Sequence, residues 1–267
     1  VTSTDKAYQS AYDASHGPLQ DGRLKPDMSA VGYGVYSDIG VDTYEYASGT
    51  SMASPNTAGA LALLAQRYKQ LFGNVNPRAD LLKALILNGT TDIGNPGPDF
   101  KYGFGSLNLV RSLQILDSNR YVTDSVSTGG QKTLTIHVPA NTAQLKVMLY
   151  WHDAPADLLS AHQLVNDLDL SVSDPTATLH RPLVLDTLPA NVNNNAMEGI
   201  DRINNCEQVT INNPAAGNYT LKVNGYSVPS GNQPYVVAYD IIPTGMKLTF
   251  PTSGIALAAN KICYIYW

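Results

Sequence analysis

The sequence predicts an α+β protein of two domains, in which an α/β region is followed by an all-β sandwich. Up to about residue 118, apolar residues recur in several segments with the period of a helix. From about residue 120 the apolar period changes to 2, and strand-like segments alternate with turn residues. A chain of 267 residues is long enough for two compact domains with cores of their own.

The first 48 residues contain no long helical period, and their Gly and Pro residues indicate short strands and loops. After the sequence GTSMASP at residues 49–55, residues 56–68 are apolar on most of the circumference of a helix, which predicts a buried helix. Pro55 is expected in its first turn. Gly59 costs about 1 kcal/mol relative to alanine, which indicates close packing against a neighbouring strand or helix, with neutral drift as the alternative. Gly73 is expected to end the helix.

Two more helices are expected before residue 118. Asn76 and Pro77 supply an N-cap and a proline at the first helical position, which predicts a helix over about 76–88. The sequence YGFG at residues 102–105 predicts a turn. It precedes a third helix, whose expected apolar stripe is Leu107, Val110 and Leu113.

The rest of the chain predicts strands. They are expected at residues 133–138, 145–151, 165–172, 208–211, 219–223 and 235–241. Six to eight strands without a helix between them imply a β-sandwich or jelly roll.

Charge and composition exclude several classes of function. The formal net charge is −5, with 17 basic residues and no cluster of Lys or Arg, which argues against a nucleic-acid or anionic-membrane partner. No apolar run approaches the ~20 residues that a membrane-spanning helix needs. The two cysteines, Cys206 and Cys263, fit neither a metal cluster nor a disulfide framework, and we expect two free thiols.

Ser51 is the candidate for nucleophilic chemistry. It lies at the mouth of the first predicted helix, where helix-terminal N–H groups and the positive end of the dipole favour the negative charge of an acyl-transfer oxyanion. Ser and Thr also begin helices by capping N–H groups, which is their commoner use. Spacing alone therefore leaves both interpretations open.

The sequence around Ser51 resembles the nucleophile segment of the subtilisin-like serine proteases (subtilases), Gly-Thr-Ser-Met-Ala-x-Pro at the start of a helix. The segment SHGP at residues 15–18, followed by DGRLKPD at residues 21–27, resembles the stretch that precedes the nucleophile in this family. His16 stands where the family usually has Arg, and Asn56 stands where it usually has His. Because Ala53 replaces the second glycine of Gly-x-Ser-x-Gly, an α/β-hydrolase is disfavoured.

The resemblance extends over most of the chain. The sequence HDAP at residues 152–155 and the sequence AGNYT at residues 216–220 resemble the jelly-roll domain of extracellular alkaline subtilases. It implies that residues 1–118 are the nucleophile half of a catalytic domain and that residues 119–243 are a jelly roll. Residues 244–267 would begin a further β-sandwich. The implied protein is secreted and cleaves proteins or peptides.

The same resemblance implies that Ser51 forms the acyl-enzyme with Thr50 beside it, while the other catalytic groups lie outside these residues. In the chain order of the family, the catalytic Asp and His and the oxyanion Asn precede Val1. We therefore expect this chain alone to be inactive, and its partner to be the N-terminal part of the catalytic domain. A half-domain also leaves sheet edges open, and three solutions are expected: that part covers them, a second copy of the chain covers them, or the first ~100 residues pack in a rearranged way against the jelly roll.

Four polar residues of the sandwich suggest a second site. Asn166, Asp167 and Asp169, with Asp153 further away, offer the oxygen ligands that calcium prefers. A solvated acidic edge is the alternative. His152 adjoins Asp153, but neighbouring side chains on a strand point to opposite faces, so this pair is not expected to serve Ser51 as a base.

A non-catalytic function is the alternative to a peptidase. In this interpretation the sandwich is a binding or structural module for carbohydrate, peptide or a cell-surface partner, and residues 1–118 are a protease remnant. Exposed aromatic residues on one sheet face, such as Tyr219, Tyr226 or Tyr235, would favour it.

Overall fold

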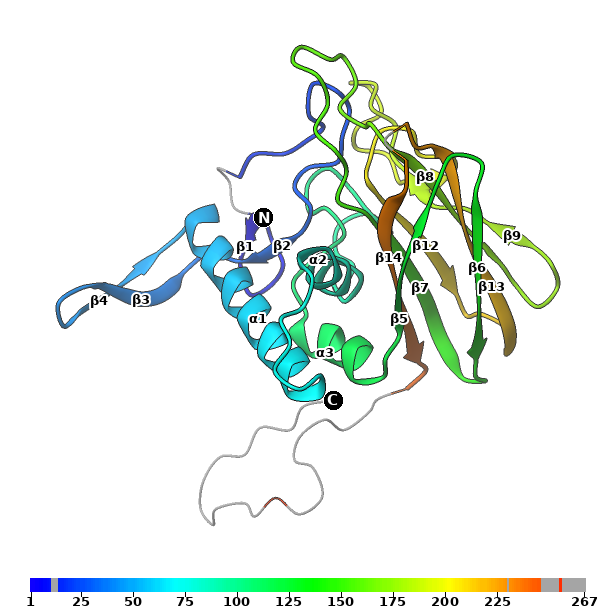
Figure 1. Ribbon diagram of the computed structural model, residues 1–267. Helices are drawn as coiled ribbons and strands as arrows, with labels where there is room; N and C mark the ends of the chain where they lie inside the picture. Colours follow the sequence, from blue (N-terminus) through cyan, green and yellow to red (C-terminus); the bar gives the residue numbers. More distant parts are fainter. Residues whose placement is uncertain (11–13, 230, 246–254, 256–267) are drawn as a thin grey trace.

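The computed structural model describes residues 1–10, 14–229, 231–245 and 255. A small α/β part with its helices lies beside an antiparallel β-sandwich (Figure 1). The predicted order of an α/β segment followed by an all-β sandwich is confirmed. The further β-sandwich that was predicted from residue 244 onward lies almost wholly outside the described residues, as does Cys263.

Short strands precede the first helix, as the turn residues predict. Strands β1 (Thr2–Thr4) and β2 (Ser29–Val31) pair in parallel. Strands β3 (Val35–Gly40) and β4 (Thr43–Ala47) form an antiparallel hairpin that projects from the body of the molecule (Figure 1). The strands β1 and β2 are almost fully buried, whereas most residues of the hairpin are exposed.

Helix α1 (Thr50–Leu71) corrects three expectations. Its buried residues form a single stripe, Ala53, Thr57, Ala60 and Leu64, and the opposite side is exposed, so the prediction of a helix buried on most sides is wrong. The reason is that in the described chain only β1, β2, α2 and α3 make substantial contact with it. A Cβ atom at Gly59 would meet no atom within 4 Å, so close packing does not explain this glycine. Pro55 lies inside the helix, since the helix begins at Thr50.

The predicted stop signals located the C-terminal ends of the helices better than the predicted start signals located their N-terminal ends. Gly73 follows α1 with φ of +64°, as a C-terminal glycine does, and α2 (Ala79–Asn88) ends directly before Gly89. Helix α2 begins later than predicted, because the extended residue Arg78 is its N-cap and bonds to Asp80 in the first turn. None of the described helices is long and apolar enough to cross a membrane.

Helix α3 (Leu109–Asp117) begins at an asparagine cap. The side chain of Asn108 accepts a hydrogen bond from the backbone N–H of Arg111 (3.1 Å). The predicted stripe is partly wrong, because Val110 is 56% exposed. Its fully buried residues are Ser112, Ile115 and Leu116, one turn further along the chain.

The sandwich has jelly-roll topology. One sheet has the order β12-β7-β14-β5, and the other has the order β6-β13-β8-β9. When these eight strands are renumbered 1 to 8 along the chain, the two orders are 6-3-8-1 and 2-7-4-5. The strands of the first sheet are β5 (Tyr121–Val126), β7 (Thr142–Tyr150), β12 (Cys206–Asn212) and β14 (Gln233–Pro243). The strands of the second are β6 (Gln131–Val138), β8 (Asp167–Ser173), β9 (Leu179–His180) and β13 (Gly217–Ser227). A short pair, β10 (Leu183–Val184) and β11 (Met197–Glu198), accompanies them.

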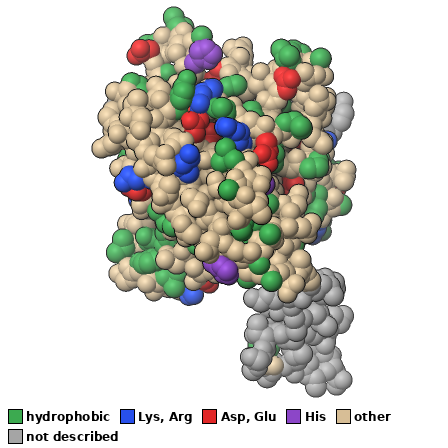
Figure 2. Space-filling view, turned by 90° about the vertical axis from the view of Figure 1, so that its right-hand side faces the viewer, with side chains coloured by type: hydrophobic (Ala, Val, Ile, Leu, Met, Phe, Trp, Pro, Cys, Tyr) green, Lys and Arg blue, Asp and Glu red, His purple; other side chains and the backbone are tan. Residues whose placement is uncertain are grey.

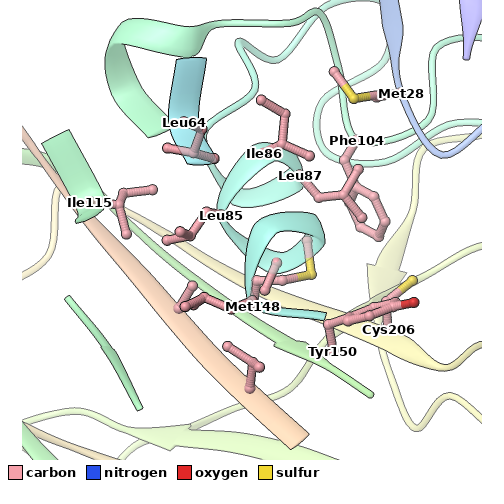
Figure 3. Packing of buried hydrophobic residues seen from close by; sticks show 14 of the residues in the cluster. Met28, Leu64, Leu85, Ile86, Leu87, Phe104, Ile115, Met148, Tyr150 and Cys206 are labelled. Carbon is pink, nitrogen blue, oxygen red and sulfur yellow. The ribbon is translucent and has the colours of Figure 1, made fainter. Parts of the chain in front are cut away.

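The sheet that contains β7 and β14 is apolar on both faces. Alternate residues such as Leu145, Val147 and Leu149 lie in the core between the two sheets. The residues between them face the helices, and Met148, Tyr150, Cys206, Val236 and Ala238 share one apolar cluster with α2 and α3 (Figure 3). The helices and the sandwich therefore have a common core. The Cys206 thiol is buried and free, and burial raises its pKa to about 12.

A buried polar seam, formed by Asn88, Lys146, Asp240 and Arg111, crosses the same contact. Lys146 and Asp240 are directly opposite each other on β7 and β14, and both are at most 4% exposed. The Lys146 ammonium donates to the carbonyl of Thr90 (2.9 Å), and Arg111 donates twice to one oxygen of Asp240 (2.9 and 2.7 Å). The Asn88 amide donates to the carbonyls of β7 and β14. The seam satisfies these buried groups and fixes how the helices lie on the sheet.

Candidate active site

Ser51 and Thr50 are exposed in the first turn of α1. The hairpin leads into this turn, and the hydroxyl of Ser48 accepts a hydrogen bond from the N–H of Gly34 (2.9 Å). The carbonyl of Gly49 accepts the N–H groups of Met52 and Ala53 (3.0 and 3.3 Å). The first N–H groups of a helix have no intrahelical partners, and the N-terminus is the positive end of the helix dipole. Ser51 therefore lies beside backbone N–H donors in a region of positive potential.

Two glycines hold this turn in place. Gly49 has φ of +146° and ψ of +170°, a conformation that essentially only glycine adopts, and its N–H donates to the carbonyl of Gly32 (2.8 Å). A Cβ atom at Gly32 would lie 2.5 Å from the oxygen of Gly49 and 2.8 Å from the nitrogen of Ala53. Glycine at both positions lets the end of β2 touch the start of α1. The sequence shows these glycines, but the contact between them joins segments that a local pattern does not connect.

Asn56, one turn further along α1, joins the helix to β2. Its amide donates to the carbonyl of Val31 (3.2 Å). Asn56, which stands where subtilases usually have His, therefore has a structural role. Pro55 and Asn56 also line a groove of about 760 Å³ between α1 and the segment around Leu107.

The histidines described next have neighbours other than Ser51. His16 lines a groove with Asn95 and Asn193, His137 contacts Asn218 at 3.2 Å, and His180 lies within 4 Å of Asp174 and Glu198. Within the described ranges, no side chain hydrogen-bonds to the Ser51 hydroxyl. Next to His152, the carboxylate of Asp153 accepts the N–H groups of Val165 and Asn166 (2.7 and 2.9 Å) and so closes the base of a loop.

The carboxylates proposed for calcium face a cation of the chain itself. Arg202 donates to Asp167 (3.2 Å) and to Asp169, and its guanidinium lies 3.7 Å from the centre of the Tyr226 ring. Burial raises the pKa of Asp167 to about 6, and Arg202 only partly offsets this effect. The described residues contain no group of three or more His, Cys, Asp or Glu side chains that could hold a metal ion. The donor set therefore does not fit calcium well, and the calcium site stays a prediction.

These contacts predict how stability responds to calcium. We expect the melting temperature to be the same with added Ca²⁺ and with a chelator, because the Arg202 guanidinium already bonds to both carboxylates and compensates part of their charge. The measurement is thermal unfolding of the parent and of a variant with Asp167→Ala and Asp169→Ala. A Ca²⁺-dependent rise in melting temperature that the variant loses would establish the calcium site instead.

The sandwich tyrosines do not form one exposed face. Tyr219 and Tyr235 are 1% and 2% exposed and belong to the core, while Tyr226 is 58% exposed and stacks on Arg202. Seen from the side of β6, β13 and β9, acidic and basic side chains lie close to each other in the central part of the surface (Figure 2). The sequence did not predict that Arg202 pairs with the carboxylates proposed for calcium, because 33 residues separate Arg202 from Asp169.

Comparison with known proteins finds a family model and several relatives that resemble this chain. A model of the subtilase family matches residues 1–105. Pyrolysin from Pyrococcus furiosus is 37% identical over 114 residues, which are 40% of this chain and 8% of pyrolysin. The serine protease/ABC transporter B family protein tagA of Dictyostelium discoideum is 26% identical over 260 residues, 83% of this chain and 15% of that protein. C5a peptidase from Streptococcus pyogenes is 35% identical over 80 residues, 29% of this chain and 7% of that protein.

The chain thus spans less than a fifth of the length of each of these relatives. The matched residues contain both strands of the parallel pair, the hairpin, α1 with Ser51, and α2. Residues 1–105 of this chain belong to the subtilase family of serine proteases.

Proposed function

We propose that Ser51 is the nucleophile of a subtilase endopeptidase, and that its hydroxyl attacks the scissile carbonyl of a protein or peptide to form an acyl-enzyme. The observation that carries this proposal is the exposed position of Ser51 in the first turn of α1, held there by Gly32 and Gly49. The backbone N–H of Ser51 and the dipole of α1 would stabilise the oxyanion, with Thr50 beside them.

The general base and its orienting acid would come from outside residues 1–267. A serine hydroxyl needs both partners to act as a nucleophile. The parallel pair β1 and β2 supports an outside contribution, because in the described chain these two strands form a sheet of their own, and a two-stranded sheet leaves strand edges open to further pairing. A polypeptide that supplies the catalytic Asp and His and the oxyanion Asn would also extend this sheet. A second copy of the chain is the other candidate for covering it.

The complete protein would act outside the cell or at its surface. This part of the proposal rests on the likeness of the sandwich to the jelly rolls of extracellular subtilases. Its substrates would be proteins, as for the family to which residues 1–105 belong.

The purified chain is expected to show no turnover of casein or of a fluorogenic peptide that depends on Ser51. Without base, acid and oxyanion side chain, nearly all stabilisation of the transition state is lost. Turnover that disappears in Ser51→Ala, from material whose intact mass shows one polypeptide, would contradict the need for outside groups.

The nucleophile itself is tested in the assembled protein. When the polypeptide that carries the other catalytic groups is present, a fluorophosphonate probe is expected to label the parent chain but not the Ser51→Ala variant. Ser54→Ala is the matched control, since Ser54 is an exposed serine of the same helix and its variant should still be labelled. Labelling that survives Ser51→Ala would assign the nucleophile to another residue.

A further inference from the structure

The hairpin in front of Ser51 carries an exposed aromatic surface. Tyr36 is opposite Tyr46 in the pairing of β3 and β4, and Asp38 is opposite Tyr44, so these four side chains share one face of the hairpin. Tyr36, Tyr44 and Tyr46 are 59%, 58% and 75% exposed. The centre of the Tyr36 ring lies 5.8 Å from that of Tyr44 and 4.9 Å from that of Tyr46. We call Tyr36, Asp38, Tyr44 and Tyr46 the tyrosine face.

The charge of the hairpin has one sign. Residues 33–48 contain the carboxylates Asp38, Asp42 and Glu45 and no Lys, Arg or His. Within the described chain none of these carboxylates forms an ion pair, and Asp38 accepts only the N–H of Gly40 (2.9 Å). The hairpin therefore combines aromatic rings with uncompensated negative charge.

This combination favours cations over anions and over purely apolar groups. A Lys or Arg side chain above a tyrosine ring gains about 0.5–1 kcal/mol at an exposed site, and the nearby carboxylates add attraction that salt screens. Phosphate backbones and anionic lipid surfaces would be repelled. Among polypeptides, a segment that presents Lys or Arg side chains fits both features.

The hairpin is also suited to hold an extended chain. In the described residues β3 and β4 pair only with each other, so each strand has a free edge at which a peptide can add. The hairpin is tied to the candidate active site, because Ser48 bonds to Gly34 and Gly49 bonds to Gly32. Only residues 48–50 separate β4 from Ser51.

We propose that the tyrosine face binds a cationic polypeptide segment, with Lys or Arg side chains over the rings of Tyr36, Tyr44 and Tyr46. As a statement about the substrate of Ser51, this inference rests on the proposed function; as a statement about binding, it stands without it. The partner thus defined is a Lys- or Arg-containing stretch of protein.

The test measures peptide binding to the Ser51→Ala chain, in which cleavage is excluded. The probes are fluorescent alanine-based peptides with lysine, norleucine or glutamate at alternate positions. We expect the lysine peptide to bind about fivefold to tenfold more tightly than the norleucine peptide, and the difference to shrink with added salt. Tyr36→Ala and Tyr46→Ala should each weaken its binding, whereas Tyr46→Phe, which keeps the ring, should not.

Tyr226→Ala is the matched control, because Tyr226 is equally exposed but lies in the sandwich, and it should leave binding unchanged. Circular dichroism and thermal unfolding verify that each variant is folded. Equal binding of the lysine and norleucine peptides, or binding that the hairpin variants leave unchanged, would overturn the inference. Self-association that Tyr46→Ala abolishes would assign the face to a second copy of the chain and also overturn it.

The outcome is independent of the proposed function. If the lysine peptide binds through the tyrosine face but the fluorophosphonate probe never labels Ser51, the binding surface stands and the peptidase proposal fails. If Ser51 is labelled but no peptide binds through the hairpin, the peptidase proposal stands and this inference fails.

Discussion

Replacing Arg111 by alanine is expected to lower the free energy of unfolding by about 3–5 kcal/mol, the usual cost of removing one partner of a buried ion pair. Its partner Asp240 is 2% exposed and accepts two hydrogen bonds from the guanidinium. Without Arg111 the carboxylate stays buried with weaker compensation, since the nearest nitrogen of Arg120 is 3.8 Å away. Urea-induced unfolding at neutral pH measures the loss.

The control is an exposed ion pair between α3 and α1. Arg67 and Asp117 bond at 2.7 Å, but their side chains are 40% and 42% exposed. Arg67→Ala should change the free energy of unfolding by no more than about 0.5–1 kcal/mol. Adding Asp240→Asn to Arg111→Ala should recover part of the loss, because the uncompensated charge is then removed. Equal effects of the two arginine variants would show that burial of Asp240 does not control stability.

The difference in stability between Lys146→Met and the parent is expected to depend strongly on pH. Burial lowers the pKa of Lys146 to about 8 from its ordinary value of 10.5, an effect that Asp240 and Asp92 partly offset and Arg111 increases. Between these two pH values the unfolded parent binds more protons than the folded parent, so its stability rises with pH. At about 1.36 kcal/mol per pKa unit, the buried ammonium costs about 3 kcal/mol below pH 8.

Methionine has a similar shape and does not titrate. The free energy of unfolding of Lys146→Met minus that of the parent should therefore be largest below pH 8 and fall by about 3 kcal/mol by pH 10.5. The Cys206 thiol, whose pKa is raised, lowers stability as the pH rises from 9 to about 12, but it does so in both proteins and cancels in the difference. Urea unfolding at several pH values gives both curves. A difference that stays constant across this window would contradict the lowered pKa.

Local patterns predicted the elements of this chain better than their surroundings. Apolar segments bounded by turn residues located the main strands of the sandwich, and the motif around Ser51 located the start of a helix. The burial of α1 was predicted wrongly, because the apolar content of a helix does not tell which elements lie beside it. The pairs Arg111–Asp240 and Arg202–Asp169 span 129 and 33 residues, so no local pattern contains them.

One signal for the common core was present in the sequence. Residues 145–151, LKVMLYW, are apolar at nearly every position and not at every second one. A strand with one face in water alternates, whereas a strand covered on both faces is apolar throughout. The structure shows the second cover to be α2, which packs on β7 and β14.

That two-sided sheet limits how the sandwich can be separated from the helices. A sandwich without α2 and α3 would present Met148, Tyr150, Val236 and Ala238 to water, an apolar patch of the kind that promotes aggregation. A sandwich transferred alone into another protein is therefore expected to aggregate. The unit expected to fold with its apolar surface covered is the helix pair together with the jelly roll.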